Sequence, residues 1–289
     1  MCEHDDLDEF ARRGELTRRQ FGAMALGAGL AAMLPRSAHA EETTGKDVQI
    51  ITPDGTCDAY IAHPQKGTFP AVLIWPDIFG LRPAFRAMAS RLAESGYTAL
   101  VINPFYRTRK APTAPEHADF NDPTTRDALM ALAHSLTPTT AATDARAFVG
   151  YLDTHPAVDM KKKVGTMGYC MGGPLVLRTA AARADRIGAA ATFHGGGLVT
   201  KDPDSPHLLI PQSKAHYLIA IAANDDEKDP TAKTVLREAF ERAHLPAEVE
   251  VYAGTQHGWC PPDSPVYNRD QAEKAWARLL VLFKDALTA

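Results

Sequence analysis

A cysteine flanked by glycines is the residue in this sequence best placed to act as a nucleophile. The motif Gly168-Tyr169-Cys170-Met171-Gly172-Gly173 follows the apolar run Val164–Met167 and precedes a segment with helical periodicity. The order of strand, sharp turn and helix is typical of a nucleophile elbow, G-x-S-x-G, with Cys in place of Ser. Glycines suit a turn in which neighbouring backbone passes very close. The helix N-terminus behind the turn favours a thiolate. The alternative is a glycine-rich turn around a structural cysteine.

Such a nucleophile needs an acid and then a base later in the chain, each following a strand. The apolar run Tyr217–Ala222 is followed by acidic residues. Among them Asp225 is the predicted acid and Asp226 the second choice, while a solvated acidic loop is the alternative for this segment. His257 is the predicted base, because it follows the last predicted strand on a glycine-containing loop before the final helix. Its position, rather than its type, distinguishes it among eleven histidines.

Metal chemistry finds no support in the sequence. Neither H-E-x-x-H nor C-x-x-C spacing occurs, and the acidic run lacks the central glycine of a calcium loop. We therefore expect no metal and no cofactor. His194-Gly195-Gly196-Gly197 looks like a lipase oxyanion sequence, but it follows the elbow instead of preceding it, so we interpret it as a tight turn that could line the pocket. The second oxyanion donor is expected in the segment Trp75–Gly80, at the end of the third predicted strand.

The elements that must position these residues alternate along the chain. Alternating strands and helices predict a mostly parallel sheet of about eight strands with helices on both faces, and Asp54-Gly55 predicts a hairpin between the first two strands. The Pro-rich stretch Arg107–Asp122 is interpreted either as a substrate-facing loop or as a mere connection. The predicted strands are Val48–Thr52, Asp58–Ala62, Ala71–Trp75, Thr98–Ile102, Val164–Met167, Ala189–Phe193, Tyr217–Ala222 and Glu248–Tyr252. The predicted helices are Pro83–Glu94, Thr124–Ser135, Thr139–Thr154, Gly172–Arg183, Thr231–His244 and Tyr267–Leu287.

Residues 1–40 have the pattern of an export signal. Leu16-Thr17-Arg18-Arg19-Gln20-Phe21 resembles a twin-arginine signal, and the apolar run Phe21–Leu34 is too short to span a membrane. Ala38-His39-Ala40 offers a signal peptidase site. We expect cleavage near Ala40, transient contact with the twin-arginine export machinery, a single domain over residues 41–289 and a periplasmic location. A buried N-terminal helix is the alternative.

Charge and cysteine content exclude several classes of function. The formal net charge of −4 leaves no basic surface for nucleic acid and no polybasic patch for a membrane, so no stable membrane anchor is expected. Beyond residue 40 the chain keeps Cys57, Cys170 and Cys260, an odd number. A disulfide framework therefore does not organise the fold, and at least one thiol is free or pairs with another molecule.

Taken together, these motifs resemble the dienelactone hydrolase family of the α/β-hydrolase superfamily, from about Ile51 to Leu287. The resemblance implies an α/β-hydrolase fold, with Cys170 as nucleophile, Asp225 as acid and His257 as base. The segments that carry it are Asp77-Ile78-Phe79-Gly80, Arg91-Leu92-Ala93-Glu94-Ser95-Gly96-Tyr97, the cysteine elbow and His257-Gly258.

The resemblance also implies roles around the elbow. Backbone N–H groups of Met171 and Ile78 would bind an oxyanion, and Asp77 stands where the family usually has a Glu that holds the resting cysteine. Family members grip a substrate carboxylate with arginines, but the segment Trp259–Pro262 after His257 contains no arginine. This departure disfavours a dienelactone with a free carboxylate as the substrate.

The predicted function is therefore hydrolysis of a small carboxylic ester or lactone through a Cys-His-Asp triad and a thioester acyl-enzyme. One alternative is a non-catalytic or thiol-redox-sensing protein with the same fold. Another is a peptidase or thioesterase specificity, because substrate choice resides in loops that the fold does not determine.

Overall fold

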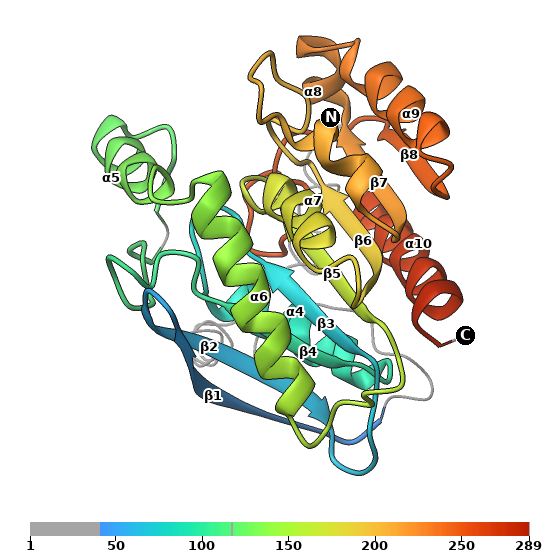
Figure 1. Ribbon diagram of the computed structural model, residues 1–289. Coiled ribbons are helices and arrows are strands. Elements are labelled where there is room, and N and C mark those ends of the chain that lie inside the picture. Colours follow the sequence, from blue (N-terminus) through green and yellow to red (C-terminus); the bar gives the residue numbers. More distant parts are fainter. Residues whose placement is uncertain (1–40, 117, 289) are drawn as a thin grey trace, which may run out of the picture.

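The computed structural model describes residues 41–116 and 118–288, so the predicted export signal at residues 1–40 lies outside the described residues. Within the described part, eight strands form one sheet in the order β1-β2-β4-β3-β5-β6-β7-β8 (Figure 1). The strands are β1 (Thr43–Thr52), β2 (Gly55–Pro64), β3 (Ala71–Trp75), β4 (Thr98–Ile102), β5 (Val164–Tyr169), β6 (Ile187–Phe193), β7 (His216–Ala222) and β8 (Ala247–Tyr252).

Strand directions follow the predicted pattern. β1 and β2 form an antiparallel hairpin, which closes at Gly55 with φ +137°, and β2 pairs antiparallel with β4. From β4 through β3, β5, β6 and β7 to β8 every pairing is parallel. The mostly parallel sheet with an N-terminal hairpin is confirmed. All residues of β3, β4 and β5 are buried, as expected for strands covered on both faces.

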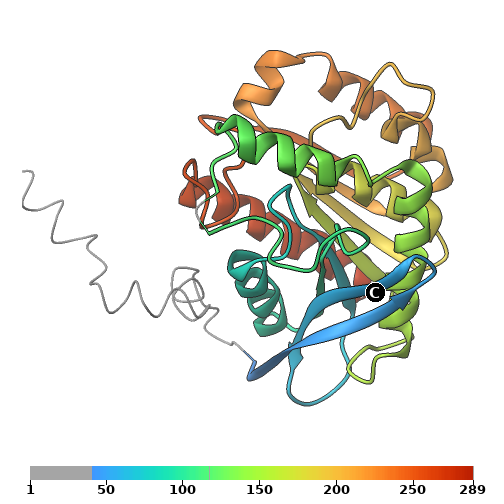
Figure 2. The ribbon, with the colours of Figure 1, turned by 90° about the vertical axis from the view of Figure 1, so that its left-hand side faces the viewer.

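Helices cover both faces of the sheet. α4 (Pro83–Glu94) and α10 (Arg269–Leu287) pack on one face, and their apolar sides form one core cluster with that face. α6 (Pro138–Thr154), α7 (Gly172–Ala182) and α9 (Ala232–Arg242) form a second core cluster on the other face. Figures 1 and 2 show the two helical layers with the sheet between them. None of the helices in the described ranges combines the length and apolar character that a membrane span requires.

A small third cluster lies apart from these cores. α5 (Pro123–Ala133) contributes Leu129 and Leu132, which pack with Ile78 and Phe105. The preceding excursion also contacts the segment after β3, since Thr113 donates a hydrogen bond to the carbonyl of Phe79 (3.1 Å). The excursion is therefore packed against the segment that follows β3.

Two short elements had no sequence signal. α8 (Ala223–Lys228) directly follows β7, and a 3₁₀ helix covers Pro206–Gln212. Both are under eight residues, too short to show helical periodicity in the sequence. α8 matters for function because it places the predicted acid on a helical turn rather than on a loop.

Candidate active site

The carboxyl ends of five parallel strands, β3, β5, β6, β7 and β8, lie at the same end of the sheet. Trp75 of β3 pairs with Gly168 of β5, Tyr169 of β5 with Phe193 of β6, and Ala222 of β7 with Tyr252 of β8. The residues directly after these strands therefore share one end of the sheet. In open α/β sheets this end is where ligands bind.

Cys170 stands on a strained turn after β5. Its φ is +51°, which a residue with a side chain adopts only when its surroundings enforce it. The Cys170 N–H donates to the carbonyl of Phe193 (3.1 Å), and the Cys170 carbonyl accepts from Gly173 (3.0 Å). These bonds fix the turn between β6 and the start of α7.

The flanking glycines are required by close backbone contacts. A Cβ on Gly168 would lie 2.4 Å from the carbonyl oxygen of Gly172. A Cβ on Gly172 would lie 2.4 Å from the carbonyl oxygen of Trp75 and 2.9 Å from that of Pro76. The elbow therefore packs directly on the backbone at the end of β3, which brings the segment after β3 beside Cys170.

The three described cysteines differ in exposure. All are free thiols; Cys57 and Cys260 are buried, whereas Cys170 is half-buried. Burial raises the pKa of the Cys57 and Cys260 thiols, so both stay protonated and inert. Cys170 is thus the cysteine that solvent and small molecules reach.

The predicted acid and base lie together. Asp225 on α8 and His257 on the β8–α10 loop form a bond of 2.6 Å between Oδ2 and Nδ1. The side chain of Asn224 supports the pair by accepting a hydrogen bond from the His257 N–H (2.8 Å). Asp226, the second choice from the sequence, instead accepts hydrogen bonds from Lys233 at 2.6 and 2.7 Å. The structure therefore brings Asp225, and not Asp226, to His257.

The electrostatics of His257 indicate an imidazolium. Burial by itself lowers its pKa, but the hydrogen bonds and charges of Asp225 and Cys170 outweigh burial and raise the pKa of His257 to about 10. Because Nδ1 faces Asp225, Nε2 is the nitrogen that can interact with Cys170. The carboxylate and the thiol beside the ring thus both favour the protonated form of His257.

His194 lies against His257, at the turn that the sequence analysis placed near the pocket. Its ring centroid is 5.0 Å from that of His257, in an edge-on arrangement, and 5.3 Å from that of Trp259. Burial and the neighbouring His257 lower the pKa of His194 well below its ordinary value. His194 is therefore a neutral ring that supports one side of His257. His194 has a left-handed φ of +42°, which places it in a tight turn. The glycines that follow it are the signal of this turn in the sequence.

The expected oxyanion donors lie on the elbow and on the segment after β3. Met171 immediately follows Cys170, and Ile78 follows β3, with both side chains packed in the third apolar cluster. Among the hydrogen bonds of the described residues, none uses the backbone N–H of Met171 or of Ile78. These two backbone N–H groups are therefore free to act as hydrogen-bond donors.

Asp77 has a different partner from the one that the family resemblance implied. Both of its oxygens accept hydrogen bonds from Arg82, at 2.6 and 2.9 Å, and Oδ1 also accepts from the Phe79 N–H (2.9 Å). No hydrogen bond in the described ranges joins Asp77 to Cys170. Arg82 also donates hydrogen bonds to Asp263 on the loop after His257. Sequence reasoning missed both Arg82 and Asp263, because no local pattern links them.

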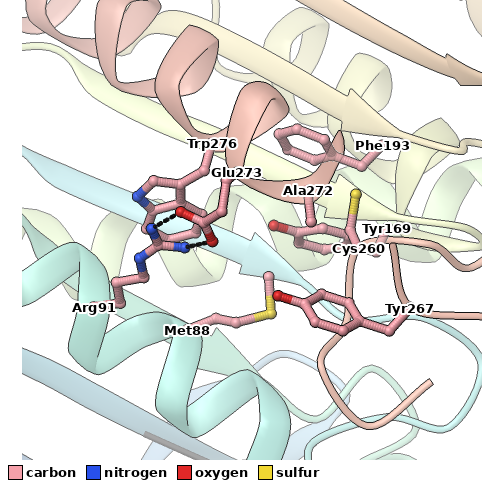
Figure 3. A pocket seen from close by; sticks show the side chains of 9 residues that line it. All are labelled: Met88, Arg91, Tyr169, Phe193, Cys260, Tyr267, Ala272, Glu273 and Trp276. Atoms are coloured by element: carbon pink, nitrogen blue, oxygen red, sulfur yellow. Dashed lines mark hydrogen bonds and ion pairs between the residues drawn. The ribbon is translucent and has the colours of Figure 1, made fainter. Parts of the chain in front are cut away.

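A separate small cavity lies behind the site. It measures about 10 Å³ and is closed on one side by the Arg91–Glu273 ion pair, with Cys260 beside Tyr169 and Phe193 (Figure 3). This is room for about one water molecule. Cys260 therefore has a packing role. Over the described residues, no group of His, Cys, Asp and Glu side chains is arranged to hold a metal ion.

Comparisons with known proteins identify the family of the chain and agree with its fold. The model of the dienelactone hydrolase family matches residues 57–287. A carboxymethylenebutenolidase from Rhodococcus opacus is 27% identical over 232 residues, covering 78% of this chain and 85% of its own. The dienelactone hydrolase of Anabaena variabilis superposes with a TM-score of 0.59 at 17% identity, covering 86% of this chain and all of its own. A dienelactone hydrolase-like promiscuous phosphotriesterase from metagenomic libraries superposes with a TM-score of 0.67 at 22% identity, covering 85% of this chain and 99% of its own.

Proposed function

The chain belongs to the dienelactone hydrolase family, whose enzymes hydrolyse carboxylic esters and lactones, and we propose that it does so through Cys170, His257 and Asp225. One observation carries the proposal. A cysteine held at φ +51° on the strand–helix turn shares the sheet edge with a histidine that is bonded to a carboxylate at 2.6 Å. That arrangement provides a nucleophile, a base and a group that orients the base.

The first half of the reaction forms a thioester. The proton of the Cys170 thiol passes to Nε2 of His257, and the thiolate attacks the carbonyl carbon of the ester or lactone. The carbonyl π pair moves onto oxygen, which binds the N–H groups of Met171 and Ile78; each such donor contributes roughly 10²–10³ in rate. Collapse of this intermediate breaks the C–O bond, and His257 returns the proton to the departing alkoxide. For a lactone, the new hydroxyl stays attached to the acyl group.

The second half releases the acid. His257, again neutral, takes a proton from water, and the resulting hydroxide attacks the thioester carbonyl. The C–S bond then breaks and restores the thiolate beside the imidazolium. Thiolates leave readily, so we expect esters with good leaving groups, such as enol lactones and aryl esters, to be the faster substrates.

A small panel of aryl esters, alkyl esters and enol lactones tests the proposal, with intact-mass detection of an acyl adduct. We expect an adduct on the wild-type protein, no adduct and no hydrolysis with Cys170→Ala, and slow acylation with His257→Ala. A thiol-redox sensor would instead form a stable sulfenate or mixed disulfide and hydrolyse none of the panel. Full hydrolysis by Cys170→Ala would refute the role of Cys170.

We also propose that the protein is exported through the twin-arginine pathway, on the basis of Arg18-Arg19 and Ala38-His39-Ala40. Cell fractionation of a Gram-negative host tests this. Wild-type protein is expected in the periplasm with a new N-terminus near Glu41, and Arg18→Lys/Arg19→Lys protein is expected in the cytosol. Equal distribution of the two would contradict the proposal.

A further inference from the structure

Arg82 joins two segments of the site that are 181 residues apart in the sequence. Its Nη1 and Nη2 bond both oxygens of Asp77, at 2.6 and 2.9 Å, and its Nε and Nη2 bond both oxygens of Asp263, at 2.6 and 3.0 Å. Nη1 also reaches the carbonyl of Gly80 at 3.4 Å. These bonds engage all five N–H donors of the guanidinium, and Phe85 packs against its face with a distance of 4.8 Å to the ring centroid. The group is thus held in one position.

Asp77 would be a competitor of His257 if it were not engaged. It follows Trp75 and Pro76, whose carbonyls touch the elbow at Gly172, and it is 7% exposed. A carboxylate at this place has two ways to oppose a thiolate at Cys170: by accepting a hydrogen bond from the thiol and by its own negative charge. The bidentate bond to Arg82 engages both oxygens and balances the charge.

We propose that Arg82 is a positioning residue that holds the Asp77 carboxylate away from Cys170, so that His257 takes the thiol proton in the resting enzyme. The inference rests on the proposed role of Cys170 as nucleophile. It assigns to this chain a resting state in which the cysteine pairs with histidine, and it gives a physical reason why an aspartate stands at position 77. The short side chain reaches the Phe79 N–H and Arg82 together, which fixes the segment that carries the Ile78 N–H.

The charged groups around Cys170 come from four segments. The β8–α10 loop provides His257, and α8 provides Asp225, whose Oδ1 lies 3.9 Å from Lys228. The end of β6 contributes His194, which burial keeps neutral. The segment after β3, together with the loop before α10, contributes the set Asp77, Arg82 and Asp263. Loss of Arg82 therefore leaves the Asp77 carboxylate, which follows the backbone that packs on the elbow, with no guanidinium bound to it, and its charge then opposes the thiolate.

The pH dependence of alkylation of Cys170 by iodoacetamide, followed by intact mass, tests the inference. In Arg82→Gln the midpoint for thiolate formation is expected to rise by about one pH unit, the size of a neighbouring like charge. In the double variant Asp77→Asn/Arg82→Gln the midpoint is expected to return to the wild-type value, because the carboxylate at position 77 is absent. Arg82→Lys keeps the positive charge but loses the bidentate hydrogen bonds of the guanidinium. Its alkylation midpoint is therefore expected to rise by part of that amount.

Asp263→Asn serves as the matched control, since it weakens the second arm of Arg82 and leaves the Asp77–Arg82 bonds in place. Its alkylation midpoint is expected to match the wild type. An unchanged midpoint in Arg82→Gln, an equal shift in the double variant, or an equal shift in Asp263→Asn would each overturn the inference. Far-UV circular dichroism identifies variants that do not fold, and if Arg82→Gln is one of them, Arg82→Lys and the double variant still decide.

Failure of this inference is distinguishable from failure of the proposed function. If Cys170→Ala hydrolyses esters as fast as the wild type, the proposed function is wrong. Suppose instead that Cys170 is required and forms an acyl adduct, but that its alkylation midpoint is the same in the wild type and in the Arg82 and Asp77 variants. Then only the inference about Arg82 is wrong.

Discussion

Removal of the Asp225 carboxylate should lower the pH at which activity is lost on the alkaline side. The Asp225–His257 bond of 2.6 Å is one of the interactions that raise the pKa of His257 from 6.5 to about 10, a shift of about 3.5 units. The side chains are 24% and 32% exposed, so solvent screens part of their attraction. We assign about 1–2 units of the shift to Asp225, which corresponds to about 1–3 kcal/mol. In Asp225→Asn the alkaline limb should therefore move from about pH 10 to about pH 8–9.

The sign of this shift follows from the role of the imidazolium. His257 must carry a proton in order to give it to an alkoxide, and it loses that proton as the pH rises through its pKa. An alkyl ester, whose alkoxide is a poor leaving group, is the substrate that reports this step. An aryl ester needs less help from an acid, so its alkaline limb should be weaker. We also expect kcat for Asp225→Asn to fall by roughly 10²–10⁴, since the ring loses the group that orients it.

Steady-state hydrolysis of both esters between pH 6 and 11 gives the measurement. Asp226→Asn is the matched control, because it removes a neighbouring carboxylate on the same helix whose partner is Lys233. Its profile should follow the wild type. An identical alkaline limb in Asp225→Asn and the wild type, or an equal shift in Asp226→Asn, would refute the assignment of the acid.

Thermal unfolding provides an independent reading of the same pair. The folded pKa of His257 is above its unfolded value, so the stability it contributes is complete below about pH 6.5 and is lost as the pH rises through about 10. The difference in Tm between the wild type and Asp225→Asn should accordingly shrink over this range. A constant difference would show that the bond does not depend on the proton of His257.

Further outcomes follow from packing and burial. Gly172→Ala places a Cβ 2.4 Å from a carbonyl at the end of β3 and should cost about 2–4 kcal/mol in urea unfolding, whereas Gly150→Ala, in open space on α6, should stabilise by about 0.5–1 kcal/mol. Asp144→Asn removes a fully buried charge that Arg107 bonds through two nitrogens, and we expect a loss of about 3–5 kcal/mol by the same assay. Among the three described cysteines of the native protein, iodoacetamide should label Cys170 alone, and the two buried cysteines should react only after unfolding, as peptide mapping would show.

The sequence determined most of the fold because burial on both faces leaves a simple pattern. β3 and β4 have the predicted bounds, since a central strand is apolar throughout and ends where the polar residues begin. The hairpin was predicted too short. β1 begins at Thr43. Its N-terminal half, which includes the exposed residues Lys46 and Asp47, is extended because it pairs with β2. That pairing is a long-range backbone interaction, which local hydropathy does not record.

The choice between Asp225 and Asp226 shows where local reasoning ends. Both residues follow the same strand, and in an extended loop either side chain could face His257. In α8 successive residues point about 100° apart, so one of the two carboxylates faces His257 while the other turns toward Lys233 at the start of α9. The sequence places an acid after β7, but the unpredicted helical turn decides which of the two faces His257.

Arg82 marks a different limit, because its role depends on two partners that have unrelated sequence positions. Within the segment Asp77–Arg82 a carboxylate and a guanidinium five residues apart have no helical or strand spacing that predicts contact. The tight turn at Gly80, with φ +74°, brings them together, and the loop after His257 then adds Asp263. The resemblance to a family predicts that a carboxylate stands at position 77. It does not predict which cation binds that carboxylate and offsets its charge. In this chain Arg82 is the group that pairs with Asp77, so the proposed pairing of Cys170 with His257 would depend on residue 82 as well as on residue 77.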